Sequence, residues 1–212
     1  MYSLNFLSLI ALFTLCFSIV SYAQVQQAVP SLKQYDAKRV DQSPILDGAL
    51  EASFWETSDW SSGFSINGKP VISDFDTQFK VLYNQTHLFV AVLCRDPHPD
   101  SIPLYPSPRD NSSNDWLEVD FDTDLNQQSA YSFSVSPYGV RTDQLITGDD
   151  ADFDDSWHPK WQVKTKVTPQ GWIAEIAIPF QQLNFSKSKT QTWGFQIVRK
   201  VSRRDEVSYW AK

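Results

Sequence analysis

The sequence contains few residues of the types that form disulfide bonds or bind transition metals, with two cysteines and three histidines in 212 residues. Cys16 lies in an apolar N-terminal stretch, whereas Cys94 ends the apolar run Val90–Cys94, which is typical of a buried strand. The histidines are scattered and match neither the spacing of a zinc site nor that of a catalytic triad. We therefore expect Cys94 to be a buried thiol and the mature chain to lack an intramolecular disulfide.

Basic residues are also few, with 18 Lys and Arg against 25 Asp and Glu, which gives a net charge of -7. Nucleic acids and anionic membrane surfaces are bound by basic surfaces, so the charge argues against both as partners. Aromatic residues, by contrast, make up 14% of the chain, including eight Trp and eight Tyr. Such rings fill the core of a β-sandwich and also stack on the apolar faces of sugars, so composition alone leaves both uses open.

The first 23 residues carry no charge, run apolar from Phe6 to Val20 and end in Ser21-Tyr22-Ala23. This pattern predicts a signal peptide over residues 1–23, with the mature chain starting near Gln24. The alternative is an apolar anchor, although the stretch is short for one. We expect an exported protein located in the periplasm, at the outer membrane or outside the cell.

The remainder of the chain, about 190 residues, is enough for one domain with a sizeable core. Apolar residues alternate with polar ones from residue 77 onward, as in Leu117-Glu118-Val119-Asp120-Phe121 and Tyr131-Ser132-Phe133-Ser134-Val135. The pattern is typical of antiparallel strands with one face in the core and one in water. We predict an all-β antiparallel β-sandwich of about nine or ten strands, with one or two short helical turns at Gly48–Trp55 and Phe180–Leu183.

The predicted organisation has four parts: the signal peptide 1–23, an extended polar lead-in 24–43, the sandwich 44–200 and a junction 201–212. The proline-rich segment Pro97–Asn114 is predicted to be a long loop inside the sandwich.

Several short motifs follow one another in a characteristic order. Ile45-Leu46-Asp47-Gly48 leads into Phe54-Trp55, then come Asp115-Trp116-Leu117-Glu118-Val119-Asp120-Phe121 and finally Gly171-Trp172 with a strand that ends in Ile178-Pro179. In this order the motifs resemble the family 9 carbohydrate-binding modules across nearly all of the mature chain. The resemblance implies a β-sandwich whose partner is a polysaccharide or oligosaccharide.

The last residues, Arg199–Trp210, resemble the end of an N-terminal module that precedes an outer-membrane β-barrel in long proteins of Bacteroidetes-type bacteria. This resemblance implies a possible C-terminal barrel absent from the chain. An interaction domain serving such a barrel, without a sugar ligand, is therefore the main alternative to carbohydrate binding.

The family clamps its sugar with loop-borne tryptophans at the rim of the sandwich, which directs attention to Trp116 and Trp157. The water-facing side of the central strands offers polar partners for sugar hydroxyls at Glu118, Asp120, Ser132, Ser134 and Gln196, and Arg141 and Arg199 are candidate donors. Core packing of the two tryptophans and an ordinary solvated sheet face are the alternatives. Five other tryptophans fit positions in the core, namely Trp55, Trp60, Trp161, Trp172 and Trp193.

Two acidic runs suggest calcium, which prefers carboxylate oxygens and is known as a structural ion in the family. The candidate ligands are Asp120, Asp122, Asp124, Asp149, Asp150 and Asp152. The first run lacks the glycine and the terminal glutamate of an EF-hand loop, so it is not one.

A glycoside hydrolase would need two carboxylates on opposite sides of the scissile bond. Glu118 with Glu175 or Asp120 could supply them, but no local motif marks such a pair. We therefore predict a non-catalytic domain and keep hydrolysis as the third hypothesis.

Overall fold

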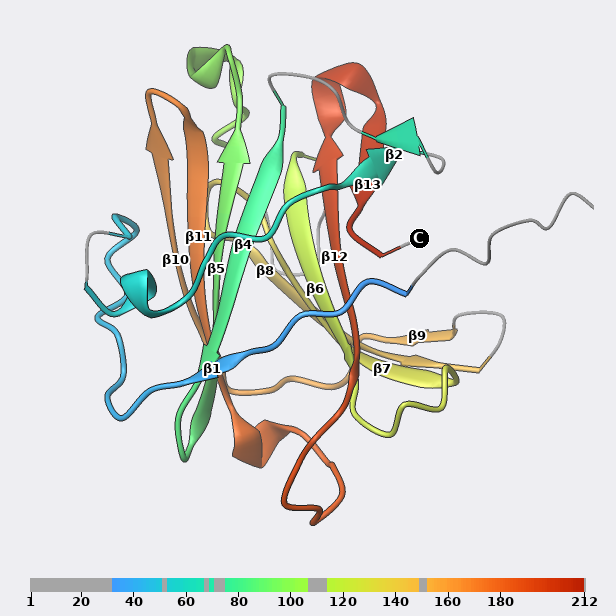
Figure 1. Ribbon diagram of the computed structural model, residues 1–212. Coiled ribbons are helices and arrows are strands. Elements are labelled where there is room, and N and C mark those ends of the chain that lie inside the picture. The colour runs from blue at the N-terminus through green and yellow to red at the C-terminus, as the bar shows by residue number, and fades with distance from the viewer. Residues whose placement is uncertain are drawn as a thin grey trace, which may run out of the picture. The chain divides into compact units, whose positions relative to one another are not determined.

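The computed structural model describes residues 32–50, 53–66, 69–70, 75–106, 114–148 and 152–211, which form thirteen strands in two sheets (Figure 1). The strands of seven to nine residues are β4 (Thr77–Tyr83), β5 (His87–Arg95), β6 (Trp116–Asp122), β7 (Ser129–Val135), β8 (Arg141–Thr147), β10 (Gln162–Thr168), β11 (Gly171–Pro179) and β12 (Gly194–Val201). The shorter strands are β1 (Lys38–Arg39), β2 (Ser65–Ile66), β3 (Lys69–Pro70), β9 (Asp152–Asp154) and β13 (Glu206–Tyr209).

Sheet A has the strand order β1-β4-β5-β11-β10, and sheet B has the order β3-β2-β13-β12-β6-β7-β8-β9. Every neighbouring pair is antiparallel except β1 and β4, which run parallel. The predicted all-β sandwich is confirmed, and the strand number exceeds the predicted one because of the short strands at the sheet edges.

The described helices are four 3-10 turns of three residues each, namely η1 (Trp55–Thr57), η2 (Pro99–Ser101), η3 (Phe180–Gln182) and η4 (Ser202–Arg204). The turn expected at residues 180–183 is present, whereas the one expected over residues 48–55 starts only at Trp55. No helix in the described ranges is long or apolar enough to cross a membrane.

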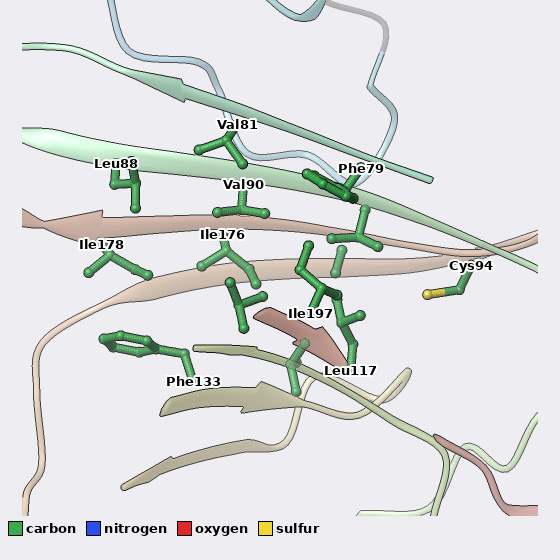
Figure 2. Close-up of a cluster of buried hydrophobic side chains, with 14 of the residues drawn as sticks. Phe79, Val81, Leu88, Val90, Cys94, Leu117, Phe133, Ile176, Ile178 and Ile197 are labelled. Carbon is green, nitrogen blue, oxygen red and sulfur yellow. The ribbon is translucent and has the colours of Figure 1, made fainter. Parts of the chain in front are cut away.

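The two sheets face each other across a core of apolar side chains (Figure 2). Val90 and Ile176 of sheet A point toward Phe133 and Ile197 of sheet B, and all four are fully buried. Cys94 lies in the same core, as the apolar run around it predicts. The alternation in β6 and β7 places one apolar residue in two against this core, which leaves the intervening polar residues on the outer face of sheet B.

The outer face of sheet A is covered by the segment that precedes η1. Leu82, Phe89 and Ala177 project from that face and pack against Trp55 and against the partly buried side chains of Val40, Leu46, Leu50 and Phe54. Strands β5 and β11 are therefore buried on both faces, which explains why their sequences are almost continuously apolar.

One buried carboxylate holds this covering segment in place. The side chain of Glu175, 1% exposed, accepts hydrogen bonds from the backbone N–H groups of Asp47 (2.9 Å) and Gly48 (2.6 Å) and from Nε1 of Trp55 (2.8 Å). Gly48 has a φ of 76°, and a side chain there would meet Cβ of Lys166 at 2.8 Å. The Asp-Gly and Trp motifs of the sequence thus form one hydrogen-bonded unit with the strand that contains Glu175.

Both flanks of the predicted 44–200 sandwich contribute to the sheets. Tyr35 from the lead-in packs on Phe79, with ring centroids 5.1 Å apart, and strand β1 follows it. Beyond residue 200, β13 pairs with β12 and β2, and Trp210 is buried in the core with its Nε1 donating to the carbonyl of Ser62. The segment expected as a junction therefore includes an integral strand of sheet B.

Candidate functional site

Polar side chains gather on the outer face of sheet B, opposite the core. Strand register puts Glu118 opposite Ser134 and Val198, and Asp120 opposite Ser132 and Gln196. Cross-strand partners lie on the same face of a sheet, so the rows extend to Thr142 and Gln144 of β8. We name this surface the polar face, and its members are Trp116, Glu118, Asp120, Ser132, Ser134, Thr142, Gln144 and Gln196.

The two carboxylates of the polar face are only partly exposed. Oγ of Ser134 donates a hydrogen bond to Oε2 of Glu118 at 2.9 Å. Burial raises the pKa of Glu118, and hydrogen bonds from Ser134 and Ser132 oppose the shift. Burial, and secondly the nearby charge of Glu118, raise the pKa of Asp120 well above its usual value. Oδ1 of Asp120 is enclosed and has no hydrogen-bond partner within the described part of the chain, so it is an acceptor in need of a donor.

Gln196 on the same face is already used by the chain itself. Its Oε1 accepts hydrogen bonds from the N–H groups of Trp210 (3.0 Å) and Ala211 (2.9 Å), and its Nε2 donates to the carbonyl of Ala211 at 2.5 Å. Gln196 thus anchors the segment after β13 rather than presenting a free amide.

Trp116 and Trp157 lie on different sides of sheet B. Trp116 is half-buried on the outer face, next to Lys200 across the strand pair and on the same side as Glu118. Trp157 packs at the inner side, with its ring centroid 5.2 Å from that of Tyr131 and 5.5 Å from that of Phe133. The structure therefore does not bring the two predicted clamp residues together, and of the two only Trp116 belongs to the polar face.

Arg141 also faces inward, because it pairs with the core residue Val135. Its NH1 donates to the carbonyl of Trp161 at 2.8 Å, and Nε1 of Trp161 donates to Oδ1 of the fully buried Asp143 at 2.8 Å. Arg141 lines a shallow cavity of about 360 Å³ at the edge of β10, away from the polar face.

Arg199 is fully buried and serves the fold. Its guanidinium donates to the backbone carbonyls of Phe75 (2.8 Å) and Arg95 (2.9 Å) and to Oγ1 of Thr77 (3.2 Å). Multiple hydrogen bonds of this kind offset the cost of burying the charge, so Arg199 is not available as a ligand donor.

The carboxylate pairs considered for hydrolysis are not arranged around a cleft. Glu175 lies on the outer face of sheet A, where its two oxygens are occupied by three donors, and the core separates it from Glu118. Glu118 and Asp120 are neighbours on one strand face, so they do not oppose each other across a bond.

Within the described ranges, no group of three or more His, Cys, Asp or Glu side chains is arranged to hold a metal ion. Asp122 instead accepts hydrogen bonds from the N–H groups of Asp124 (3.2 Å) and Gln127 (2.7 Å), which closes the turn between β6 and β7. Asp124 and Asp152 are exposed, and Asp149 and Asp150 lie outside the described residues.

Three tryptophans expected in the core, Trp55, Trp161 and Trp172, are buried, and Trp193 is partly buried against it. Trp60, in contrast, is 37% exposed, so its assignment to the core was wrong. Sequence reasoning also missed Thr142, Gln144 and Tyr209, of which Tyr209 pairs with Val198 at the margin of the polar face. The signal for Tyr209 was present in the strand-like pattern near residue 207, but its pairing partner could not be read from the sequence.

The comparison with protein families gives one match, in which the model described as "Carbohydrate family 9 binding domain-like" covers residues 45–208. No curated protein matches the chain.

Several solved structures have the same fold. A family 9 carbohydrate-binding module from Caldicellulosiruptor kristjanssonii, in complex with glucose, is 19% identical with a TM-score of 0.55, and the alignment covers 81% of this chain and 82% of that one. Its complex with cellotriose is also 19% identical, with a TM-score of 0.54 and coverages of 82% and 81%. A candidate carbohydrate-binding protein from Bacteroides uniformis ATCC 8492 is 12% identical with a TM-score of 0.65, and the coverages are 85% and 90%. At these identities the likeness establishes the fold.

Proposed function

Because the chain belongs to the carbohydrate family 9 binding domain-like family, we propose that it is a non-catalytic carbohydrate-binding domain that holds its ligand on the polar face of sheet B. The observation that carries the proposal is the position of Glu118 and Asp120 on one outer face beside the half-buried Trp116, with the buried hydroxyls of Ser132 and Ser134 next to the two carboxylates across the strand pair. Carboxylates and hydroxyls accept and donate the hydrogen bonds that sugar hydroxyls offer, and an indole ring stacks on the apolar face of a pyranose.

Asp120 has a specific part in this proposal. Its carboxyl group stands between Ser132 and Gln196 in the strand register and on the same face as Glu118, so a saccharide lying along β6 would meet both carboxyl groups, whereas the enclosed Oδ1 lies beneath that surface. Ser134 orients Glu118 through their hydrogen bond, so the second carboxylate is held in place before a ligand arrives. Two of the structural relatives contain glucose and cellotriose, which makes neutral glucose-type saccharides the first ligands to test.

The wider role that we propose is accessory. The carboxylate pairs considered for hydrolysis in the described part of the chain do not oppose each other. A glycan-binding domain without such a pair would serve polysaccharide breakdown or uptake by holding the substrate near other proteins. We place this activity at an exported location, in keeping with the predicted signal peptide.

The test is binding of the chain to a glycan array and to affinity gels containing plant, algal and bacterial polysaccharides. Trp116→Ala should weaken binding by about 1–3 kcal/mol, as loss of a stacking ring does elsewhere, with little change in melting temperature. Glu118→Gln should also weaken binding, because it replaces an oriented acceptor by a group that is half donor.

Trp157→Ala is the matched control. Its ring packs on Tyr131 and Phe133, so the variant should melt at a lower temperature but bind normally below that temperature. Retention of the wild-type chain on no glycan would refute the proposal and favour the interaction-domain hypothesis. Equal affinities of the wild type and Trp116→Ala would refute the assignment of the polar face.

A further inference from the structure

Trp60 is the most exposed tryptophan in the described part of the chain, and it lies on the opposite side of the sandwich from the polar face. Its exposed fraction is 37%, whereas every other described tryptophan is buried or half-buried. A single exposed aromatic residue is ordinary on a protein surface. The groups beneath and beside this ring, however, hold it in a defined position.

Lys80 supports one face of the ring. This residue projects from the outer face of sheet A and is 7% exposed. Its ammonium lies 4.8 Å from the centroid of the Trp60 ring and donates a hydrogen bond to the carbonyl of Trp55 at 2.7 Å. The charge is therefore fixed under the indole, where it attracts the electron-rich ring face.

The backbone next to the ring is also fixed. Ser61 and Phe79 exchange two backbone hydrogen bonds of 2.9 Å each, which attaches the segment after Trp60 to the edge of β4. No other aromatic ring of the described residues packs against Trp60. The indole is thus oriented by the fold while a large part of it remains open to solvent.

Two exposed carboxylates, Glu56 and Asp59, precede Trp60 in the chain. Burial lowers the pKa of Lys80, and the charges of Asp59 and, to a smaller extent, Glu56 oppose the shift, so both carboxylates lie within electrostatic reach of the ammonium beneath the ring. Within the described part of the chain neither carboxylate accepts a hydrogen bond, so their oxygens can accept hydrogen bonds from a ligand.

We propose that Trp60, Glu56 and Asp59 form a second saccharide-binding site, in which the apolar face of a pyranose ring stacks on the indole and its hydroxyls donate to the carboxylates. The ligand class is a neutral saccharide, since the two carboxylates would repel uronates and sulfated sugars. The proposal rests on the proposed function for the choice of ligand, but the site is separate from the polar face.

Two sites on opposite outer faces have a consequence for affinity. One short oligosaccharide cannot occupy both, because the two sheets and the core lie between them. Two chains of a polysaccharide, or two distant parts of one chain, can do so, and the second contact then forms at a high effective concentration.

The experiment is a titration of the 15N-labelled chain with cellotriose, in which the indole N–H signals of the tryptophans are followed by NMR. The Trp60 signal is assigned by its absence from Trp60→Ala, and that of Trp116 by its absence from Trp116→Ala. We expect both signals to shift with separate saturation curves, and the Trp60 shift to persist in Trp116→Ala. Asp59→Asn and Glu56→Gln should weaken the Trp60 curve several-fold and leave the Trp116 curve unchanged, whereas Asp100→Asn, which neutralises an exposed carboxylate elsewhere, should alter neither.

Three outcomes distinguish the two proposals. A Trp116 shift without a Trp60 shift would overturn the second site and leave the polar face intact. A Trp60 shift without a Trp116 shift would support the second site and overturn the polar face. The absence of both shifts with millimolar cellotriose, and again with any saccharide that the glycan array retains, would overturn both. The shifts are read in the wild-type chain, and if Trp60→Ala proves unstable, Trp60→Phe, which also lacks the indole N–H, assigns the Trp60 signal.

Discussion

Replacement of the buried carboxylate of Glu175 by an amide should destabilise the whole domain. In Glu175→Gln the single amide oxygen can accept from the N–H groups of Asp47 and Gly48, but the NH₂ group then faces Nε1 of Trp55, which is also a donor. A buried donor without a partner costs about 1–3 kcal/mol, and the remaining hydrogen bonds lose the help of the negative charge. We expect a total loss of about 2–4 kcal/mol.

This loss is measurable by urea denaturation and by thermal melting. For a domain of this size, 1 kcal/mol corresponds to about 2–4 °C in melting temperature, so the shift should be on the order of 5–15 °C. Hydrogen exchange of the Asp47 and Gly48 amides should accelerate, because their acceptor is weakened. Glu206→Gln is the control, since Glu206 pairs with the half-exposed Arg204 and should matter by less than about 1 kcal/mol.

A double-mutant cycle makes the test sharper. Trp55→Phe removes the opposing N–H group, so Glu175→Gln should cost less in that background than in the wild type. A Glu175→Gln variant within about 0.5 kcal/mol of the wild type would show that the three hydrogen bonds do not hold the covering segment. Equal costs in both backgrounds would show that the clash with Trp55 is not the cause.

Four further predictions concern separate features. Gly48→Ala should lose about 2 kcal/mol or more in a urea melt, because alanine is strained at a φ of 76° and its Cβ would meet Lys166; a neutral result would exclude that close contact. Folding raises the pKa of Asp120, so ionisation of this carboxyl costs more free energy in the folded chain than in the unfolded chain, and this cost disappears as the pH falls. Asp120→Asn should therefore be more stable than the wild type at neutral pH, with the difference shrinking toward about pH 4. A difference that does not depend on pH would contradict this. Burial raises the pKa of Cys94 to about 12, so the thiol should react with a disulfide reagent at pH 8 only after unfolding, and rapid reaction of the folded chain would disprove its burial. If the acidic runs bind calcium, millimolar CaCl₂ should raise the melting temperature by several degrees over EGTA at matched ionic strength, and Asp152→Ala should reduce the effect; identical melting curves would mean that the runs are solvated loops.

The fold was predictable from the sequence where apolar periodicity is strong. The alternation in β6 and β7 predicted which residues face the core, and the same parity predicted that Glu118, Ser132 and Ser134 share the outer face. A strand with one buried face shows this alternation in its sequence, because a shift of its pairing register by one residue would expose all of its apolar side chains.

The sequence of β8 does not show this alternation of apolar and polar residues. Its inward residues include the half-buried Arg141 and the fully buried Asp143, and Trp161 supplies a hydrogen-bond partner for each. Polar residues satisfied by a distant side chain look like solvent-facing ones in a sequence, so Arg141 was expected beside the polar face. The separation of Trp116 from Trp157 has a similar origin, since it depends on where the loop after β9 returns to the core.

The exposure of Trp60 could not be predicted from the sequence either. An aromatic residue three positions beyond a short helical turn is expected to pack inward, and only the structure shows that Lys80 occupies the surface below it. Conversely, the Asp-Gly and Trp motifs were visible in the sequence, but their common partner Glu175 stands far along the chain and could not be assigned to them.

The position of Glu175 has a consequence for the order of events during synthesis. Trp55 is added to the chain 120 residues before Glu175, its hydrogen-bond partner. At about 5–20 residues per second, the delay is about 6–24 s, during which the covering segment lacks this hydrogen-bond partner and the part of its apolar surface that β11 supplies. For that interval the nascent chain exposes Phe54 and Trp55, a hydrophobic stretch that chaperones can recognise before the domain closes over it.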